Sequence, residues 1–330
     1  MGVSSKTKKA LKKAVKQKKH RRRGSWLFIE HGDAPGEIFS KLLTQFAVLV
    51  LAACGVIFVN EARLSFTAKT LNKDLRVLYN TYIGDIAENI GELTGGGKKQ
   101  LLPGAEKLLE INPDTVGYIV IDGTDISLPV VQRTSSDGNE YYLKTAFDGS
   151  VNKAGTIFLD FRAKLGADKR SDVLTLYGHN QRDLTMFGEL KNYKGNVDFY
   201  KSHPVITFYS NYEKDTYKIF GYFVTEVLPE QTKDGNVFRY HNFIDLDRSS
   251  YEEFISNIEL RSQIITGVDV KYGDEFLTLS TCSNEFEPSR FVVFARKTRD
   301  GEDETVDTSQ AVLNPSAKEP DWNVIYGKVR

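Results

Sequence analysis

The sequence predicts a mainly β protein, a closed or nearly closed barrel of eight strands, preceded by one transmembrane helix and a few shorter helices. Two observations support this prediction. Beyond Pro113 the chain consists of short strand-like runs separated by turns, with few long helices between them. Before that point, an uncharged apolar stretch follows a block of basic residues. The length of 330 residues allows one large domain or two modest ones.

Residues 1–41 form a basic tail. They contain 12 Lys and Arg residues against 3 acidic ones, whereas residues 42–330 contain 32 against 41, so the net charges are +9 and −9. Such a split indicates that the two parts face different surroundings. The block Lys6–Arg23 could bind nucleic acid, but beside a membrane segment a basic block more often contacts anionic lipid head groups. We therefore expect membrane lipid, and no nucleic acid, as its partner.

Residues 42–59 (LLTQFAVLVLAACGVIFV) carry no formal charge. As a helix they would cover roughly 27 Å, close to the thickness of a bilayer's hydrocarbon core, so we expect a transmembrane helix over 42–60. The preceding basic block puts the N-terminus in the cytoplasm and the rest outside, as a single-pass protein of the cell membrane.

Two alternatives exist for this apolar segment. Leu51–Cys54 resembles a bacterial lipoprotein processing site, yet the apolar run continues past Cys54, where a lipoprotein turns polar. A buried core helix of a soluble protein is the other alternative, but such a helix rarely follows a basic block directly.

Residues 61–110 are predicted to form a helical stalk and a small N-terminal bundle. Apolar residues recur at helical spacing over 61–82, and a second helical stretch, 84–93, ends at the Gly95–Gly97 break. A short helix over 101–110 stops before Asn112-Pro113.

Residues 111–299 are predicted to form the barrel, which contains the candidate catalytic residues. One helix, 249–260, interrupts the strand series; it has Ser249 or Ser250 as its cap and lies between the sixth and seventh strands. Residues 300–330 are acidic and then irregular, and we expect a disordered tail. The strand candidates are 117–121, 128–132, 155–159, 173–177, 205–209, 215–226, 275–281 and 291–297.

Two cysteines exist, and Cys54 lies in the membrane segment, so Cys282 is the one thiol expected outside. It ends a strand-like run. A lone thiol in that compartment is either a reactive group or a residue of the core. A nucleophilic role would require a nearby base, because the thiolate is the form that attacks a carbonyl.

Three histidines fall in the external part of the chain: His179, His203 and His241. His179 follows a buried strand and a glycine, so its imidazole is expected to emerge at a strand end, as Cys282 does. His203 and His241 are expected to be surface residues. His179 is therefore the preferred base.

Arg290 opens the strand after Cys282, and residues 283–289 are long enough for a hairpin turn that returns it toward the thiol. A guanidinium there would supply fixed positive charge to an oxyanion. The alternative is a solvated pair with Glu285 or Glu287. Arg296 shares the face of Arg290 but lies roughly 20 Å further along the strand. No paired spacing of metal ligands and no phosphate-binding glycine loop occurs, so we expect neither metal nor cofactor.

These residues also resemble a known family. Over roughly residues 105–298 the chain is similar to the sortases, membrane-anchored cysteine transpeptidases of Gram-positive bacteria, and most similar to class B. The matching segments are 111–121 (INPDTVGYIVI), 128–132 (LPVVQ), 155–160 (GTIFLD), 176–180 (LYGHN), 186–190 (MFGEL), 277–282 (LTLSTC) and 290–293 (RFVV).

The resemblance implies an eight-stranded sortase-type barrel with Cys282 as nucleophile, His179 as acid/base and Arg290 as oxyanion stabiliser. It implies no cofactor. Its expected partners are surface proteins with a C-terminal sorting signal, cleaved after threonine, and the amine of a lipid-linked peptidoglycan precursor. Residues implied in substrate binding are Asn139, Leu143, Asn180, Ser280 and Thr281.

Two other functions stay open from the sequence. In a pilin polymerase, a lysine of another protein replaces the cell-wall amine, and acceptor choice depends on groove shape. A catalytically silent module would only hold sorting signals, although the intact Cys282, His179 and Arg290 argue against it.

Overall fold

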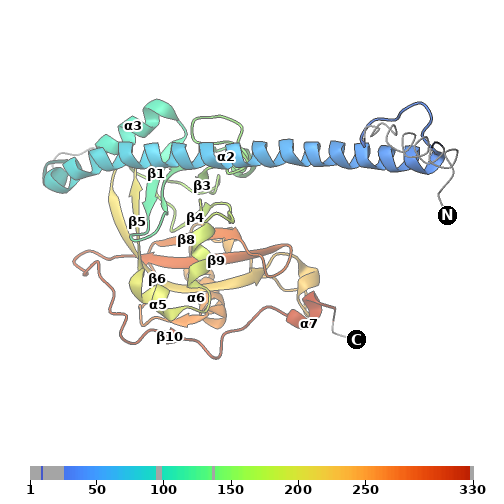
Figure 1. The fold of residues 1–330 in the computed structure, drawn as a ribbon. Coiled ribbons are helices and arrows are strands. Elements are labelled where there is room, and N and C mark those ends of the chain that lie inside the picture. The colour runs from blue at the N-terminus through green and yellow to red at the C-terminus, as the bar shows by residue number, and fades with distance from the viewer. Residues whose placement is uncertain (1–8, 10–25, 94–98, 136–137, 328–330) are drawn as a thin grey trace, which may run out of the picture. The chain divides into compact units, whose positions relative to one another are not determined.

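The computed structural model describes Lys9 and residues 26–93, 99–135 and 138–327, with the backbone alone for 83–93 (Figure 1). The chain divides into two compact units, Met1–Arg63 and Leu64–Arg330. The helices are α2 (Pro35–Leu93), α3 (Pro103–Ile111), α4 (Gly138–Tyr141), α5 (Val197–Ser202), α6 (Arg248–Arg261), α7 (Trp322–Ile325) and the short 3-10 helices η1 (Gly188–Tyr193), η2 (Pro229–Gln231) and η3 (Tyr240–Asn242).

Helix α2 contains the apolar stretch. Within the described residues, Pro35–Tyr82 is the one helix long and apolar enough to cross a membrane, and its most apolar 18-residue window has a mean hydropathy of 2.5 with no buried residue. A helix that is apolar all round suits lipid. The sequence predicted separate helices over 42–60, 61–82 and 84–93, but the structure has one continuous helix. No glycine or proline interrupts residues 56–83. The expected break at Gly95–Gly97 lies outside the described residues.

In the second unit, α2 packs on the barrel through Leu75 and Tyr79, both buried. The ring of Tyr79 stacks on Tyr118 of the barrel, with centroids 3.9 Å apart and an interplanar angle of 6°. Helix α3 covers the same cluster. A Cβ at Gly104 of α3 would lie 2.8 Å from Cε2 of Tyr79, so only glycine fits this contact unchanged.

The eight predicted strands are all present, and they close into a barrel, which confirms the predicted fold. Neighbouring strands are antiparallel except for two parallel pairs, β2 (Ser127–Val131) with β3 (Ile157–Leu159) and β4 (Val173–Tyr177) with β8 (Phe276–Cys282). A separate two-stranded sheet pairs β7 (Ile264–Ile265) with β10 (Val312–Leu313). The barrel order is β1 (Thr115–Val120), β2 (Ser127–Val131), β3 (Ile157–Leu159), β4 (Val173–Tyr177), β8 (Phe276–Cys282), β9 (Ser289–Lys297), β6 (Lys214–Glu226) and β5 (Val205–Ser210).

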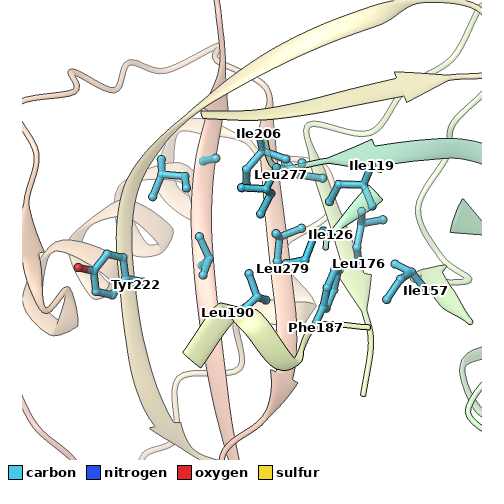
Figure 2. Packing of buried hydrophobic residues seen from close by; sticks show 14 of the residues in the cluster. Ile119, Ile126, Ile157, Leu176, Phe187, Leu190, Ile206, Tyr222, Leu277 and Leu279 are labelled. Carbon is cyan, nitrogen blue, oxygen red and sulfur yellow. The ribbon is translucent and has the colours of Figure 1, made fainter. Parts of the chain in front are cut away.

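Apolar side chains fill the barrel interior. Figure 2 shows residues from different strands meeting there, including Ile119 of β1, Leu176 of β4 and Leu279 of β8, each with no exposed surface. Close-packed interiors resist displacement of the strands that form them. The core therefore holds the ends of β4, β8 and β9 in fixed positions at the barrel rim.

Helix α6 lies between β6 and β8, the sixth and seventh barrel strands along the chain, as predicted. The predicted cap, Ser249 or Ser250, was wrong, because the N-cap residue is Asp247. The carboxylate of Asp247 accepts the backbone N–H of Ser250 at 2.8 Å. Aspartate is among the preferred N-cap residues. The buried residues Phe254 and Ile258 of α6 belong to an aromatic cluster on the outer face of β6, β8 and β9.

The C-terminal segment differs from the expected disordered tail. Residues 300–327 are described in full, and their backbone runs along the barrel to α7. Glu302 explains part of this order. Its carboxylate accepts two hydrogen bonds of 2.6 Å from the guanidinium of Arg296, whose side chain is 1% exposed. A buried cation needs counter-charge, and Glu302 of the acidic segment supplies it together with Asp269, which lies 3.1 Å from the same guanidinium.

We expect Glu302→Gln to destabilise the fold by about 2–3 kcal/mol, because Arg296 loses its main partner. Hydrogen bonds from Arg296 hold the pKa of Glu302 well below its usual range. A carboxylate with a depressed pKa stabilises the fold above its unfolded pKa and less as the pH falls, so the wild-type advantage should shrink below about pH 4. Urea unfolding in detergent, followed by circular dichroism, measures both effects.

Glu304→Gln is the matched control. Glu304 pairs with Lys214 at 3.2 Å and is 60% exposed, so its loss should cost less than about 0.5 kcal/mol. Equal effects of the two substitutions would contradict a specific role for Glu302.

Candidate active site

The parallel ends of β4 and β8 bring His179 and Cys282 together. Tyr177 of β4 pairs with Ser280 of β8. Because the two strands are parallel, the residues two positions further along, His179 and Cys282, lie beside each other. Three hydrogen bonds continue the pairing past β4. The N–H of Gly178 donates to the carbonyl of Ser280 at 3.2 Å, and the Thr281 hydroxyl donates to the carbonyl of Gly178 at 2.7 Å. The side-chain amide of Asn180 donates to the carbonyl of Cys282 at 2.9 Å. The two strand ends are therefore fixed to each other.

The antiparallel pair β8 and β9 adds Arg290. Cys282 and Arg290 are direct partners in the register, and the N–H of Ser283 donates to the carbonyl of Ser289 at 3.1 Å. Directly paired residues project from the same face of a sheet. Arg296, by contrast, pairs with Phe276 at the opposite end of β8. The hairpin expected over residues 283–289 is thus present, and Arg290 is the arginine beside the thiol.

His179, Cys282 and Arg290 all line one cavity of about 430 Å³. Cys282 is exposed to it. Four of the five residues implied in substrate binding, Asn139, Leu143, Ser280 and Thr281, also line the cavity. Asn180 does not line it but holds the backbone of Cys282. The remaining lining residues are Phe158, Tyr177, Gly178, Glu226, Val227, Val237, Phe238, Arg239, Tyr240 and His241.

The ring of His179 is oriented by a backbone carbonyl. Its Nε2 lies 2.8 Å from the carbonyl oxygen of Leu143. Because a carbonyl only accepts, this bond assigns the hydrogen to Nε2 and leaves Nδ1 as the nitrogen able to exchange a proton. A Cβ at Gly178, the residue before it, would lie 2.3 Å from Cδ1 of Ile157 and 2.8 Å from Cδ2 of Phe187, so any side chain there would force these buried neighbours to shift.

Polar contacts behind the cavity wall hold Asn139 and Ser280. The hydroxyls of Tyr240 and Ser280 are 2.7 Å apart, and burial raises the pKa of Tyr240. Asn139 accepts the N–H of Phe161 at 2.9 Å, and its amide lies 3.3 Å from Asp160. Both side chains are therefore fixed before any ligand enters.

Asp160 is the centre of a charged network that the sequence reasoning missed. Burial would raise its pKa, but hydrogen bonds from Arg162 and Tyr177 outweigh this and lower it. Arg162 donates to both carboxylate oxygens at 2.9 Å, and the Tyr177 hydroxyl donates at 2.9 Å. A carboxylate held in this way remains ionised. It anchors the wall that carries Asn139.

The expectation for the other two histidines was wrong, because neither is a surface residue. His241 is half-buried and lines the cavity. Burial is the main cause that lowers its pKa, and the positive charge of Arg162 is the next. His203 is also half-buried and stacks on Phe199, with centroids 4.3 Å apart. His241 lies in a polar loop and His203 precedes Pro204 at the start of a strand, and neither position indicated burial. In the described part of the chain, no group of three or more His, Cys, Asp or Glu residues could hold a metal.

Comparisons with known proteins agree with this geometry. The family model for the sortase domain matches residues 119–298. Sortase B of Staphylococcus aureus (strain NCTC 8325 / PS 47) is 33% identical over 201 residues, which are 60% of this chain and 76% of that protein. A solved S. aureus sortase B–substrate complex is 27% identical, with a TM-score of 0.58, over 72% of this chain and 98% of the other. A structure of sortase B complexed with triglycine is also 27% identical, with a TM-score of 0.57, over 72% and 99%.

Proposed function

Because this chain belongs to the sortase family of transpeptidases, we propose that it is a class B sortase that uses Cys282 to cleave a C-terminal sorting signal after threonine. It then transfers the cleaved protein to an amine of a peptidoglycan precursor. One observation carries the proposal. The registers of β4 with β8 and of β8 with β9 converge on one rim, so that His179, Cys282 and Arg290 line the same cavity.

In the first half-reaction, the Cys282 thiolate attacks the threonine carbonyl and forms a carbon–sulfur bond. The carbonyl oxygen becomes an oxyanion, and the guanidinium of Arg290 stabilises it through fixed positive charge. The carbon–nitrogen bond then breaks, and His179 donates a proton to the leaving amine. The product is a thioacyl group on Cys282.

In the second half-reaction, the acceptor amine attacks the thioester carbonyl. His179 takes the proton of that amine, a new amide bond forms, and the sulfur of Cys282 leaves as thiolate. The imidazole nitrogen that exchanges protons is Nδ1, because Nε2 is bound to the carbonyl of Leu143. The complex of sortase B with triglycine supports an amine of the glycine type as acceptor.

Asn139, Leu143, Ser280 and Thr281 are proposed to contact the sorting signal, since they line the cavity beside Cys282. Asn180 is proposed to act differently, because its amide is bonded to the carbonyl of Cys282. It would hold the nucleophile's backbone in place. The solved complex of S. aureus sortase B with a substrate supports substrate binding by this chain.

We place the chain in the cell membrane through residues 42–59, with the N-terminus in the cytoplasm and the barrel outside. The apolar character of α2 and the basic block before it support this topology. The basic tail would contact anionic lipid, and the substrates would be surface proteins of the same cell.

The test is a product assay with the full chain in detergent. Peptides of the Asn-Pro-x-Thr-x and Leu-Pro-x-Thr-Gly types are mixed with triglycine or with a lysine-bearing peptide, and the products are analysed by mass spectrometry. We expect cleavage after threonine and a new amide to triglycine. Products with the lysine peptide alone would favour a pilin polymerase. Peptide binding with no product would favour a silent sorting-signal module.

A further inference from the structure

The C-terminal segment lies outside the matched sortase domain, which ends at residue 298, yet its last described helix contacts the hairpin of the proposed active site. The indole of Trp322 packs edge-on against Phe286, with centroids 5.6 Å apart and an interplanar angle of 88°. Tyr326 stacks on Trp322 at 6.1 Å, and its hydroxyl donates to the carbonyl of Glu285 at 2.7 Å. Both contacts fall within the Ser283–Ser289 loop.

This loop joins Cys282 directly to Arg290, so its conformation sets how the two residues face each other. It is held from two other directions as well. Lys194 donates to the Ser283 hydroxyl at 2.8 Å and to Glu285 at 2.6 Å, and Gln231 donates to the carbonyl of Pro288 at 2.8 Å. Helix α7 covers the apolar member of the loop, Phe286, which is 8% exposed. Without α7, that ring would lose its aromatic partner.

The segment also contacts the cavity wall. The N–H of Asp321 donates to Oε1 of Glu226 at 3.1 Å, and the carboxylate of Asp321 accepts the N–H of Lys233 at 2.9 Å. Glu226 lines the cavity and pairs with Ser289 across β6 and β9. One short segment thus holds both the hairpin loop and the neighbouring wall of the cavity.

We propose that Asp321–Tyr326 is a positioning element of the active site, with Trp322 as its main positioning residue. By packing on Phe286, Trp322 keeps the Ser283–Ser289 loop in the conformation that places Arg290 beside Cys282. The role in catalysis rests on the proposed function, whereas the ordering of the loop does not. Misplacing a catalytic group by about 1 Å can cost on the order of 100-fold in rate, so a loosened loop should slow acylation and leave peptide binding less affected.

Two measurements on the full chain in detergent test this. Hydrogen exchange of the Ser283–Ser289 loop needs no substrate, and in Trp322→Ala we expect it to be faster by about tenfold or more, since the loop opens locally. Exchange of β4 serves as the internal reference and should not change. The second measurement is the rate of acylation by a sorting peptide, which should fall by about 10- to 100-fold with a smaller change in KM.

Two further variants separate positioning from general stability. Trp322→Phe keeps an aromatic ring against Phe286 and should restore most of both values. Asn323→Ala changes an exposed residue of the same helix and should match the wild type in both.

Unchanged exchange of the loop in Trp322→Ala would overturn the proposal, as would faster exchange with unchanged acylation, or equal loosening of the loop and β4. If the wild type forms no product with any peptide, the proposed function fails, and the exchange measurement still decides whether α7 orders the loop.

Discussion

Cys282→Ala should abolish both peptide cleavage and transfer, with a loss of at least about 10⁴-fold in kcat, because the proposed acyl intermediate forms on the Cys282 sulfur. The substitution should leave the fold intact, since the Cys282 side chain is exposed. Initial rates of cleavage and of triglycine transfer, measured on the same preparation, check this expectation.

Cys54→Ala is the matched control. It removes the other cysteine, which lies in the apolar half of α2, and it should retain wild-type turnover in detergent. Residual transfer by Cys282→Ala at a tenth of the wild-type rate would rule out a covalent mechanism through this thiol. Loss of turnover in Cys54→Ala would instead point to the apolar segment.

Arg290→Ala should lower kcat by about 10²- to 10³-fold, the range for removing one oxyanion donor. Arg290 pairs directly with Cys282 in the β8–β9 register, and its guanidinium otherwise donates to the backbone carbonyl of Ser289 at 3.0 Å. Arg290→Lys should recover only part of the loss, because an ammonium supplies the charge but not the planar fork of donors. Single-turnover acylation with a sorting peptide is the appropriate measurement.

The control for that series is Arg248→Ala. Arg248 is 71% exposed on α6, where it pairs with Glu252 at 3.6 Å, so acylation should stay within about twofold of the wild type. An Arg290→Ala variant with an unchanged acylation rate would show that the cation beside the thiol serves the structure and not the oxyanion.

The barrel could be predicted from the sequence because each strand is indicated by its own local pattern of residues. Runs such as Val173–Tyr177 are short, consist largely of apolar, β-branched and aromatic residues, and are followed by a turn residue. The site was predicted from the same strand pattern, because its residues lie at strand ends. Cys282 ends such a run and His179 follows another by two residues, and the parallel register of β4 with β8 then places them side by side.

What the sequence reasoning missed depends on contacts between distant residues. Glu302 belongs to an acidic stretch that resembles a solvated tail, and nothing local indicates that it neutralises the buried Arg296. His241 stands in a polar stretch, but the fold brings it into the cavity. Trp322 follows a stretch of polar and proline residues, and its partner Phe286 is 36 positions earlier in the chain. Such pairings appear only once the chain is folded.

In the proposed reaction, Cys282 carries the acyl group between the two half-reactions. The most direct measurement is the intact mass of the full chain after incubation with a sorting peptide and no amine, followed by peptide mapping. We expect a mass increase equal to the peptide portion up to threonine, located on Cys282, absent in Cys282→Ala and released by triglycine. Turnover without such an adduct, or an adduct on another residue, would show that Cys282 does not carry the acyl group.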